Sequence, residues 1–408
     1  MRDGAYKWVA LGLLWVAYFL DLGSRQIYGA TLPAISSTFG VTSAQIGLVG
    51  TVFAVLYGVC APFSGLVSDI LSRKWIVTAA VAVFCLGTFL SGFTVGVGSL
   101  ILTYGVLCAV SQPFIYPPLC SIVTQLHNES RATAVSLIQL ALYAGIIICS
   151  YFGGWLSDLQ ADGWRRAFWI VGAVGLLWTA VLAFALRNTK PVRKPDETER
   201  ASVGEALKAV FSKPSAIMYC VYFALMIFVF IGYSTWTPTF LKDKYPELTL
   251  KSAALHSVLW HYIGAAAGVM IGSRISDRFA KTRKSIRLEV TVFGIVGSIP
   301  SIILMVKTPS LAVCCAALCA YGVFRGFFDS SLYVSLLDVI KPRFHATALG
   351  LTMGIGYVFG ALAPWGLGLI RQHFSIQTGF MIFAWFYALA IVLIFISRAF
   401  FLKRDYEG

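Results

Sequence analysis

The segment GLVSDILSRK, residues 65–74, is a short charged turn between two long apolar stretches, residues 43–67 and 75–96. Arg73 and Lys74 stand where the second apolar stretch begins. An apolar run of ~20 residues is long enough to cross the hydrocarbon core of a bilayer as a helix. The segment therefore indicates two membrane-spanning helices joined by a short loop, with the basic residues at a membrane surface.

The rest of the chain continues this pattern of long apolar stretches. Hydrophobic residues make up 58% of the 408 positions and charged residues 12%, and the mean hydropathy is +0.79. A water-soluble domain of this size needs more charge to cover its surface. We therefore predict an all-α membrane protein with twelve spans, at residues 8–30, 43–67, 75–96, 99–125, 132–155, 167–187, 215–240, 252–273, 287–306, 310–339, 346–370 and 376–400.

The positive charges indicate on which side of the membrane each loop lies. With both termini in the cytoplasm, the cytoplasmic segments hold 23 Lys and Arg residues and the outer loops hold seven, as the positive-inside rule requires. Because the net charge of +14 is scattered between the spans, it argues against a nucleic-acid partner. The nine cysteines lie in apolar stretches without a CxxC pair, so neither a disulfide framework nor a metal site is indicated.

A polar stretch divides the spans six and six. Residues 188–214 contain KPVRKPDETER, which is typical of a surface linker, with a short amphipathic helix expected over Val203–Val210. We predict an N-terminal six-helix bundle over residues 1–187, a cytoplasmic linker over 188–214 and a C-terminal six-helix bundle over 215–408.

Short matches between the halves indicate an internal repeat. Arg131-Ala-Thr-Ala134 recurs as His345-Ala-Thr-Ala348, and Ser68-Asp69 recurs as Ser276-Asp277, at offsets of 214 and 208 residues. Such repeats build transporters in which two bundles rock about a site at the bilayer midplane. We therefore expect two bundles related by pseudo-twofold symmetry.

The loop between the second and third spans resembles the major facilitator superfamily signature G-x-L-A-D-x-x-G-R-K. It departs from that signature at Val67 and Ser72. The resemblance implies a conformational loop motif made by Gly65, Asp69, Arg73 and Lys74, with a looser second copy that includes Asp277 and Arg278. It also implies the fold of that superfamily, in which the first, fourth, seventh and tenth helices line a central cavity.

Within the superfamily, the N-terminal half is similar to the anion:cation symporter group, which moves sugar acids and other organic anions. The resemblance rests on Arg25, Leu32-Pro33, Pro117, Arg131-Ala132, Gly163-Trp164-Arg165 and Phe168. The fourth span departs from that group because it carries no charge over residues 104–118, and Gln112 stands where the group has a Glu. Organophosphate antiporters pair a first-span Arg with one in the seventh span, and residues 217–240 contain none.

Two pairs of opposite charges lie inside predicted cavity-lining helices. Asp21 and Arg25 are four residues apart, as are Arg325 and Asp329, so each pair shares a helix face. Charges at mid-membrane are costly and are retained when they are paired or face water. We interpret Arg25 and Arg325 as carboxylate-binding residues, because the guanidinium fork matches a carboxylate. The alternative is that both pairs are internal salt bridges that position helices.

Coupling and further substrate contacts are assigned to other polar residues of the same helices and their neighbours. Asp329 and Asp21 are the candidates for carrying a coupled proton, and His261 is a candidate relay with a core histidine as the alternative. Hydroxyl bonds and ring stacking to a sugar-like ligand are expected from Tyr28, Gln112, Tyr116, Tyr233, Trp236 and Tyr357, for which packing is the alternative. Gly264, Gly268 and Gly272 predict a close-packing helix face without a ligand role.

The sequence thus predicts a secondary active transporter rather than an enzyme, since it contains neither a Walker loop nor a catalytic constellation. We expect a monomer in a bacterial inner membrane that moves a sugar acid such as a sialic acid, hexuronate or aldonate with protons or sodium, without a cofactor. The alternatives are an efflux or neutral-solute carrier with structural salt bridges, an organophosphate-type antiporter, and a non-transporting receptor or membrane enzyme.

Overall fold

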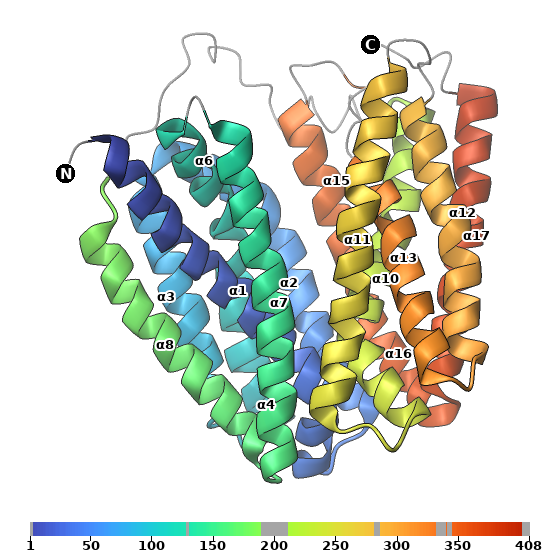
Figure 1. The fold of residues 1–408 in the computed structure, drawn as a ribbon, viewed down its shortest axis with the longest axis horizontal. Helices are drawn as coiled ribbons and strands as arrows, with labels where there is room; N and C mark the ends of the chain where they lie inside the picture. The colour runs from blue at the N-terminus through green and yellow to red at the C-terminus, as the bar shows by residue number, and fades with distance from the viewer. Residues whose placement is uncertain are drawn as a thin grey trace. The chain divides into compact units, whose positions relative to one another are not determined.

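The computed structural model describes residues 3–127, 130–188, 211–280, 286–331, 340 and 345–401. Within these residues, twelve helical segments are long and apolar enough to cross a membrane, which confirms the predicted all-helical architecture (Figure 1). The first six spans are α1 (Asp3–Phe39), α2 (Ser43–Ile70), α3 (Arg73–Ser91), a composite fourth span, α7 (Arg131–Leu159) and α8 (Gly163–Ala185). The last six are α10 (Pro214–Lys244), α11 (Leu250–Ala280), α12 (Ile286–Lys307), α13 (Leu311–Ser331), α15 with α16 (His345–Gly360 and Leu362–His373) and α17 with η4 (Ile376–Ile396 and Ser397–Phe401).

The fourth span is the most irregular of the described helices. It runs through α4 (Val97–Leu100), the π-helix η1 (Ile101–Cys108), α5 (Ala109–Ser111), the 3-10 turn η2 (Gln112–Phe114) and α6 (Tyr116–Leu126). Pro113 and the pair Pro117-Pro118 lack the backbone N–H that a regular helix requires, so the hydrogen-bond pattern changes around them. The prediction of one continuous helix over residues 99–125 is therefore wrong in its regularity, although its extent is close.

The first helix is longer than predicted. The helix predicted to end at residue 30 continues as α1 to Phe39 and contains Pro33. A helix can extend past the apolar layer when its backbone hydrogen bonds remain internal. The predicted tenth helix is described as far as Ser331, and its last residues, like the expected helix over Val203–Val210, lie outside the described residues.

By its internal packing the chain divides into two compact units. Unit 1 comprises Met1–Lys194 together with Ser234–Leu255 and Pro364–Leu369, and unit 2 comprises Pro195–Tyr233, His256–Ala363 and Ile370–Gly408. Unit 1 thus contains the first six spans and also parts of α10, α11 and α16. The domain limits expected from the linker, residues 1–187 and 215–408, stay a prediction.

Close backbone packing and a side-chain cap hold the added segments inside unit 1. A Cβ on Gly29 would lie 3.3 Å from the carbonyl oxygen of Thr235. The Asp158 carboxylate at the end of α7 accepts hydrogen bonds from the backbone N–H groups of Leu250 (2.8 Å) and Lys251 (2.9 Å), at the start of α11. A carboxylate at this position satisfies donors that have no partner within their own helix.

The predicted glycine face of the eighth span is confirmed within unit 2. A Cβ on Gly264 or Gly268 would overlap a backbone carbonyl oxygen of α13, that of Cys319 and of Val323 respectively. Glycine is therefore what lets α11 and α13 approach so closely. This contact fixes the position of α13, the helix that carries Arg325.

Candidate functional site

The first polar cluster lies in unit 1 and joins α1 to the irregular fourth span. The amide nitrogen of Gln112 donates a hydrogen bond to the Asp21 carboxylate at 3.0 Å. One guanidinium nitrogen of Arg25 donates to the amide oxygen of Gln112 at 3.4 Å. Asp21 and Gln112 are 3% and 4% exposed, so the neutral amide connects a buried carboxylate to a guanidinium one helical turn away.

Aromatic rings surround the Arg25 side of this cluster. The guanidinium carbon lies 5.2 Å from the ring centre of Phe53 and 5.6 Å from that of Tyr57, both on α2. The hydroxyl of Tyr104, on η1, donates to the backbone carbonyl of Arg25 at 3.1 Å, and its ring stacks on Tyr28 at 4.7 Å. The rings of Phe53 and Tyr57 attract the cation by cation–π interaction, and the planar fork of a guanidinium has a geometry that matches a carboxylate.

Three residues of unit 1 that were predicted to contact substrate make contacts within the protein. The Tyr28 hydroxyl donates to the backbone carbonyl of Ile46, and the buried Trp236 indole donates to the carbonyl of Pro364 at 3.0 Å. These contacts favour packing for both residues. Tyr116 is 39% exposed and its ring lies 5.4 Å from Tyr18, so its hydroxyl role stays a prediction.

The second polar cluster lies in unit 2 on α13. The Arg325 Nε donates to the Asp329 carboxylate at 2.9 Å, so the pair predicted from its spacing is confirmed. The Arg325 side chain is 7% exposed and that of Asp329 is 39% exposed. The guanidinium carbon lies 5.0 Å from the ring centres of both Phe230 and Phe328. The buried guanidinium of Arg325 is thus held against aromatic faces, as is that of the half-buried Arg25.

A tyrosine-rich wall accompanies this second guanidinium. The His261 ring lies 5.0 Å from Tyr233 and 5.4 Å from Tyr321, and the Tyr321 hydroxyl shares a 2.8 Å hydrogen bond with that of Tyr387. In the part of the chain that the structure describes, His261 Nδ1 and Arg325 Nη1 are buried without a hydrogen-bond partner. Buried polar atoms of this kind normally have a partner, so both are candidates to contact a ligand oxygen.

The remaining predicted residues are less informative. Tyr357 is half-buried on α15. In the loop motif, Arg73 is buried at the start of α3, the Lys74 ammonium lies 4.9 Å from the ring centre of Trp75, and Arg278 is exposed. The side-chain surroundings of Gly65, Asp69 and Asp277 lie outside the described residues, so the motif's function stays a prediction.

Sequence reasoning missed several residues that build the two clusters. They are Tyr104, Phe53, Tyr57, Phe230, Phe328, Tyr321 and Tyr387. One signal could have found Tyr104, because it lies in the uncharged part of a predicted cavity-lining helix. Each cluster by itself offers guanidinium donors, a hydroxyl and aromatic faces, which is a chemistry suited to binding an anion with polar and ring-like surfaces.

Comparisons with known proteins find relatives over nearly the whole chain. A family model described as Major Facilitator Superfamily matches residues 14–286. The chain is 26% identical over 396 residues to the probable sulfoacetate transporter of Cupriavidus necator, which covers 91% of this chain and 89% of that protein. It is 23% identical over 407 residues to the D-galactonate transporter of Escherichia coli, with 92% and 91% covered.

The fold also matches a solved structure. A bacterial homologue of the human lysosomal transporter Spinster, crystallised in an inward-facing and unoccupied conformation, matches with a TM-score of 0.85 at 21% identity, and the match covers 99% of each chain. At that identity the match shows a shared fold.

Proposed function

Because the chain belongs to the Major Facilitator Superfamily, we propose that it is a secondary active transporter that carries a small organic anion by alternating access. Family membership and the twelve spans confirm the predicted multi-pass membrane transporter. The names of the relatives, a sulfoacetate and a D-galactonate transporter, support an anionic substrate. Within that class we propose a sugar acid such as an aldonate, hexuronate or sialic acid.

The observation that carries this proposal is the environment of Arg25. Its guanidinium lies over two aromatic rings and contacts the amide of Gln112 rather than being buried in hydrocarbon. A charged group within a membrane span is a candidate functional residue, and a guanidinium binds a carboxylate through two parallel hydrogen bonds. We assign Arg25 to carboxylate binding and Gln112 to positioning it.

Arg325 of unit 2 is also proposed as an anion-binding residue. Its Nη1 has no partner among the described residues, while its Nε is occupied by Asp329. An arriving anion would compete with Asp329 for the same guanidinium. His261, whose Nδ1 also has no partner in the described chain, is proposed to contact the substrate or to relay a proton.

Coupling to protons or sodium is proposed to use the two carboxylates. Asp21 and Asp329 are each linked to the anion-binding machinery, one through Gln112 and one directly to Arg325. When substrate binds an arginine, the carboxylate linked to that arginine can take up or release a proton or a sodium ion. Substrate binding would thereby be coupled to the ion gradient across the membrane. By the distribution of Lys and Arg, both termini are proposed to be cytoplasmic, in a bacterial inner membrane.

Proteoliposomes containing the purified full-length chain test this function. We expect radiolabelled D-galactonate or sulfoacetate to accumulate when an inward proton or sodium gradient is imposed, and neutral D-galactose to be excluded. Uptake of galactose as fast as galactonate would instead indicate a neutral-solute carrier. Equal uptake with and without both gradients would contradict the coupling proposal.

Arg25 variants test the assigned site. Arg25→Ala should weaken anion binding by roughly 10–150-fold, which corresponds to the ~1.5–3 kcal/mol of a hydrogen bond to a charged group. Arg25→Lys keeps the charge and loses the planar fork, so its anion affinity should lie between that of the unmodified chain and that of Arg25→Ala. Arg166→Ala, at an exposed arginine, is the matched control. Unchanged affinity in Arg25→Ala would remove this residue from the site.

A further inference from the structure

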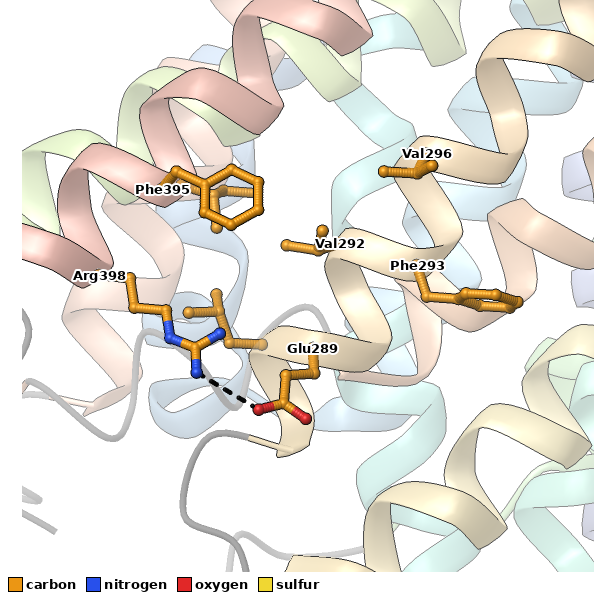
Figure 2. Close-up of a pocket in the computed structure, with 8 residues that line it drawn as sticks. Glu289, Val292, Phe293, Val296, Phe395 and Arg398 are labelled. Atoms are coloured by element: carbon orange, nitrogen blue, oxygen red, sulfur yellow. Dashed lines mark hydrogen bonds and ion pairs between the residues drawn. The ribbon is translucent and has the colours of Figure 1, made fainter.

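Two arginine–carboxylate pairs in the described part of unit 2 differ in their access to water. Arg398 and Glu289 border a groove between α12 and α17, where Figure 2 shows the guanidinium directed toward the carboxylate. Their closest atoms are 3.5 Å apart, and the two side chains are 46% and 31% exposed. Arg325 pairs with Asp329 at 2.9 Å, but its side chain is only 7% exposed. Water can solvate the remaining N–H groups of Arg398, whereas those of Arg325 depend on partners inside the protein.

One nitrogen of Arg325 lacks such a partner. The Nε donates to Asp329, and the Tyr387 hydroxyl is a further side-chain partner of the guanidinium. Nη1 is buried without a hydrogen-bond partner among the described residues. Because a guanidinium N–H can only donate, the group that completes this contact is an acceptor, such as an oxygen of a substrate carboxylate.

A second buried nitrogen lies on the neighbouring helix α11. His261 is 5% exposed, and in the described part of the chain its Nδ1 also has no hydrogen-bond partner. A Cβ on Gly322 would overlap the carbonyl oxygen of His261, so His261 is level with a position of α13 that precedes Arg325 by ~4.5 Å along the helix axis. Side chains of a helix lean toward its N-terminus. The long side chain of Arg325 is therefore directed back toward the level of His261.

Tyr321 connects the two residues. It lies four positions before Arg325 on α13, so the two share a helix face, and its ring is 5.4 Å from that of His261. The Tyr233 ring, on α10, is 5.0 Å from His261 and 4.7 Å from Tyr321. The two nitrogens thus belong to one buried cluster that is built from neighbouring helices of unit 2.

The two nitrogens differ in the hydrogen bonds that they can make. The guanidinium N–H of Arg325 donates only, which matches a carboxylate oxygen. The imidazole Nδ1 of His261 donates in one neutral tautomer and accepts in the other, and a hydroxyl can supply the complementary partner in either case. The pair of nitrogens therefore fits a carboxylate that has a hydroxyl group beside it.

Resting on the proposed function as an organic-anion transporter, we propose that this cluster selects 2-hydroxycarboxylates. Arg325 Nη1 donates to a carboxylate oxygen, and His261 Nδ1 forms a hydrogen bond with the hydroxyl on the adjoining carbon. Aldonates such as D-galactonate carry this hydroxyl, and sulfoacetate does not. His261 is then a specificity-determining residue that discriminates among the anions bound by Arg325.

Matched analogues of D-galactonate test this selectivity. Unlabelled D-galactonate, 2-deoxy-D-galactonate and 3-deoxy-D-galactonate, which share charge and chain length, compete with radiolabelled D-galactonate for the full-length chain in nanodiscs. The 2-deoxy compound should bind roughly five- to tenfold more weakly, as expected for the loss of one hydrogen bond. The 3-deoxy compound should bind about as tightly as galactonate. Equal affinity of the 2-deoxy compound and galactonate would overturn the proposal, as would an equal loss for both deoxy compounds.

Variants assign the preference to His261. His261→Phe keeps a ring and removes Nδ1, so galactonate and its 2-deoxy analogue should bind equally. His261→Asn places a side-chain amide near the position of Nδ1 and should retain the preference. The matched control is His256→Phe on the same helix, because the Nδ1 of His256 already accepts from the Trp260 indole at 2.9 Å. A preference that persists in His261→Phe, or that is lost in His261→Asn, would refute the assigned contact.

The unmodified chain separates this inference from the function on which it rests. If it binds neither galactonate nor sulfoacetate, the proposed anion transport fails and the selectivity fails with it. If it binds galactonate and its 2-deoxy analogue with equal affinity, the anion-binding function stands and the role of His261 alone is refuted.

Discussion

Removing the charge of Asp329 should make Arg325 a stronger anion-binding residue. In the structure the two groups are joined by a 2.9 Å hydrogen bond, and unit charges ~4 Å apart attract by about 4 kcal/mol at an effective dielectric constant of 20. Because the Asp329 side chain is 39% exposed, water screens much of this attraction. We expect about 1–2 kcal/mol to remain, which an incoming anion must overcome before it can replace Asp329.

Asp329→Asn preserves an oxygen acceptor and removes the charge, so the competition for Arg325 should weaken. Anion affinity should therefore increase by roughly 5–30-fold, the equivalent of about 1–2 kcal/mol. If Asp329 also carries the coupled ion, gradient-driven accumulation should be lost in the same variant. Equilibrium binding of radiolabelled galactonate in nanodiscs and uptake into proteoliposomes measure the two effects separately.

The control for this variant is Asp162→Asn, which removes the carboxylate that pairs with Arg165 at 3.4 Å on an exposed turn. It should leave both affinity and accumulation unchanged. If Asp329→Asn binds the anion no more tightly than the unmodified chain, the carboxylate does not compete with substrate. Arg325 and Asp329 would then form a structural pair.

Three further outcomes follow from individual contacts. Tyr104→Phe removes one hydrogen bond to the Arg25 carbonyl and should lower anion affinity by roughly fivefold, for a loss of about 1 kcal/mol. Unchanged binding isotherms in this variant would exclude a positioning role for Tyr104. Gly268→Ala should destabilise unit 2 by about 1–3 kcal/mol through overpacking, visible as a lower melting temperature, whereas Gly12→Ala, with open space around it, should melt normally. Asp158→Ala should accelerate amide exchange at the start of α11, because two backbone donors lose their acceptor; unaltered exchange would show that this cap is dispensable.

The twelve spans could be predicted because each one needs an apolar run long enough to cross the bilayer, and the length of such a run follows directly from the residue types. Local helix geometry could not be predicted in the same way. Hydropathy does not distinguish an α-helix from the π and 3-10 turns of η1 and η2, and the apolar pattern predicted the end of α1 at residue 30 instead of at Phe39. The backbone follows hydrogen bonding, which hydropathy does not measure.

The charged members of the candidate site were found because charge inside a membrane span is rare and costly. Asp21, Arg25, Arg325 and Asp329 were therefore identified from residue type and spacing alone. The aromatic residues around them were not, because the chain contains 18 tyrosines and 30 phenylalanines. Residue type cannot separate Tyr104, which bonds to the Arg25 backbone, from the many rings that only fill space.

The π-helix η1 determines which side chain the fourth span directs at Asp21. A π turn contains about one residue more than an α turn. If Ile101–Cys108 tightened to α-helical geometry, the residues beyond it would rotate by about 100° around the helix axis. Gln112 would swing away, and its amide would no longer connect the acid to the guanidinium. A change from π to α geometry in this stretch would thus change the hydrogen-bond partners of Asp21 and Arg25 without any movement of α1.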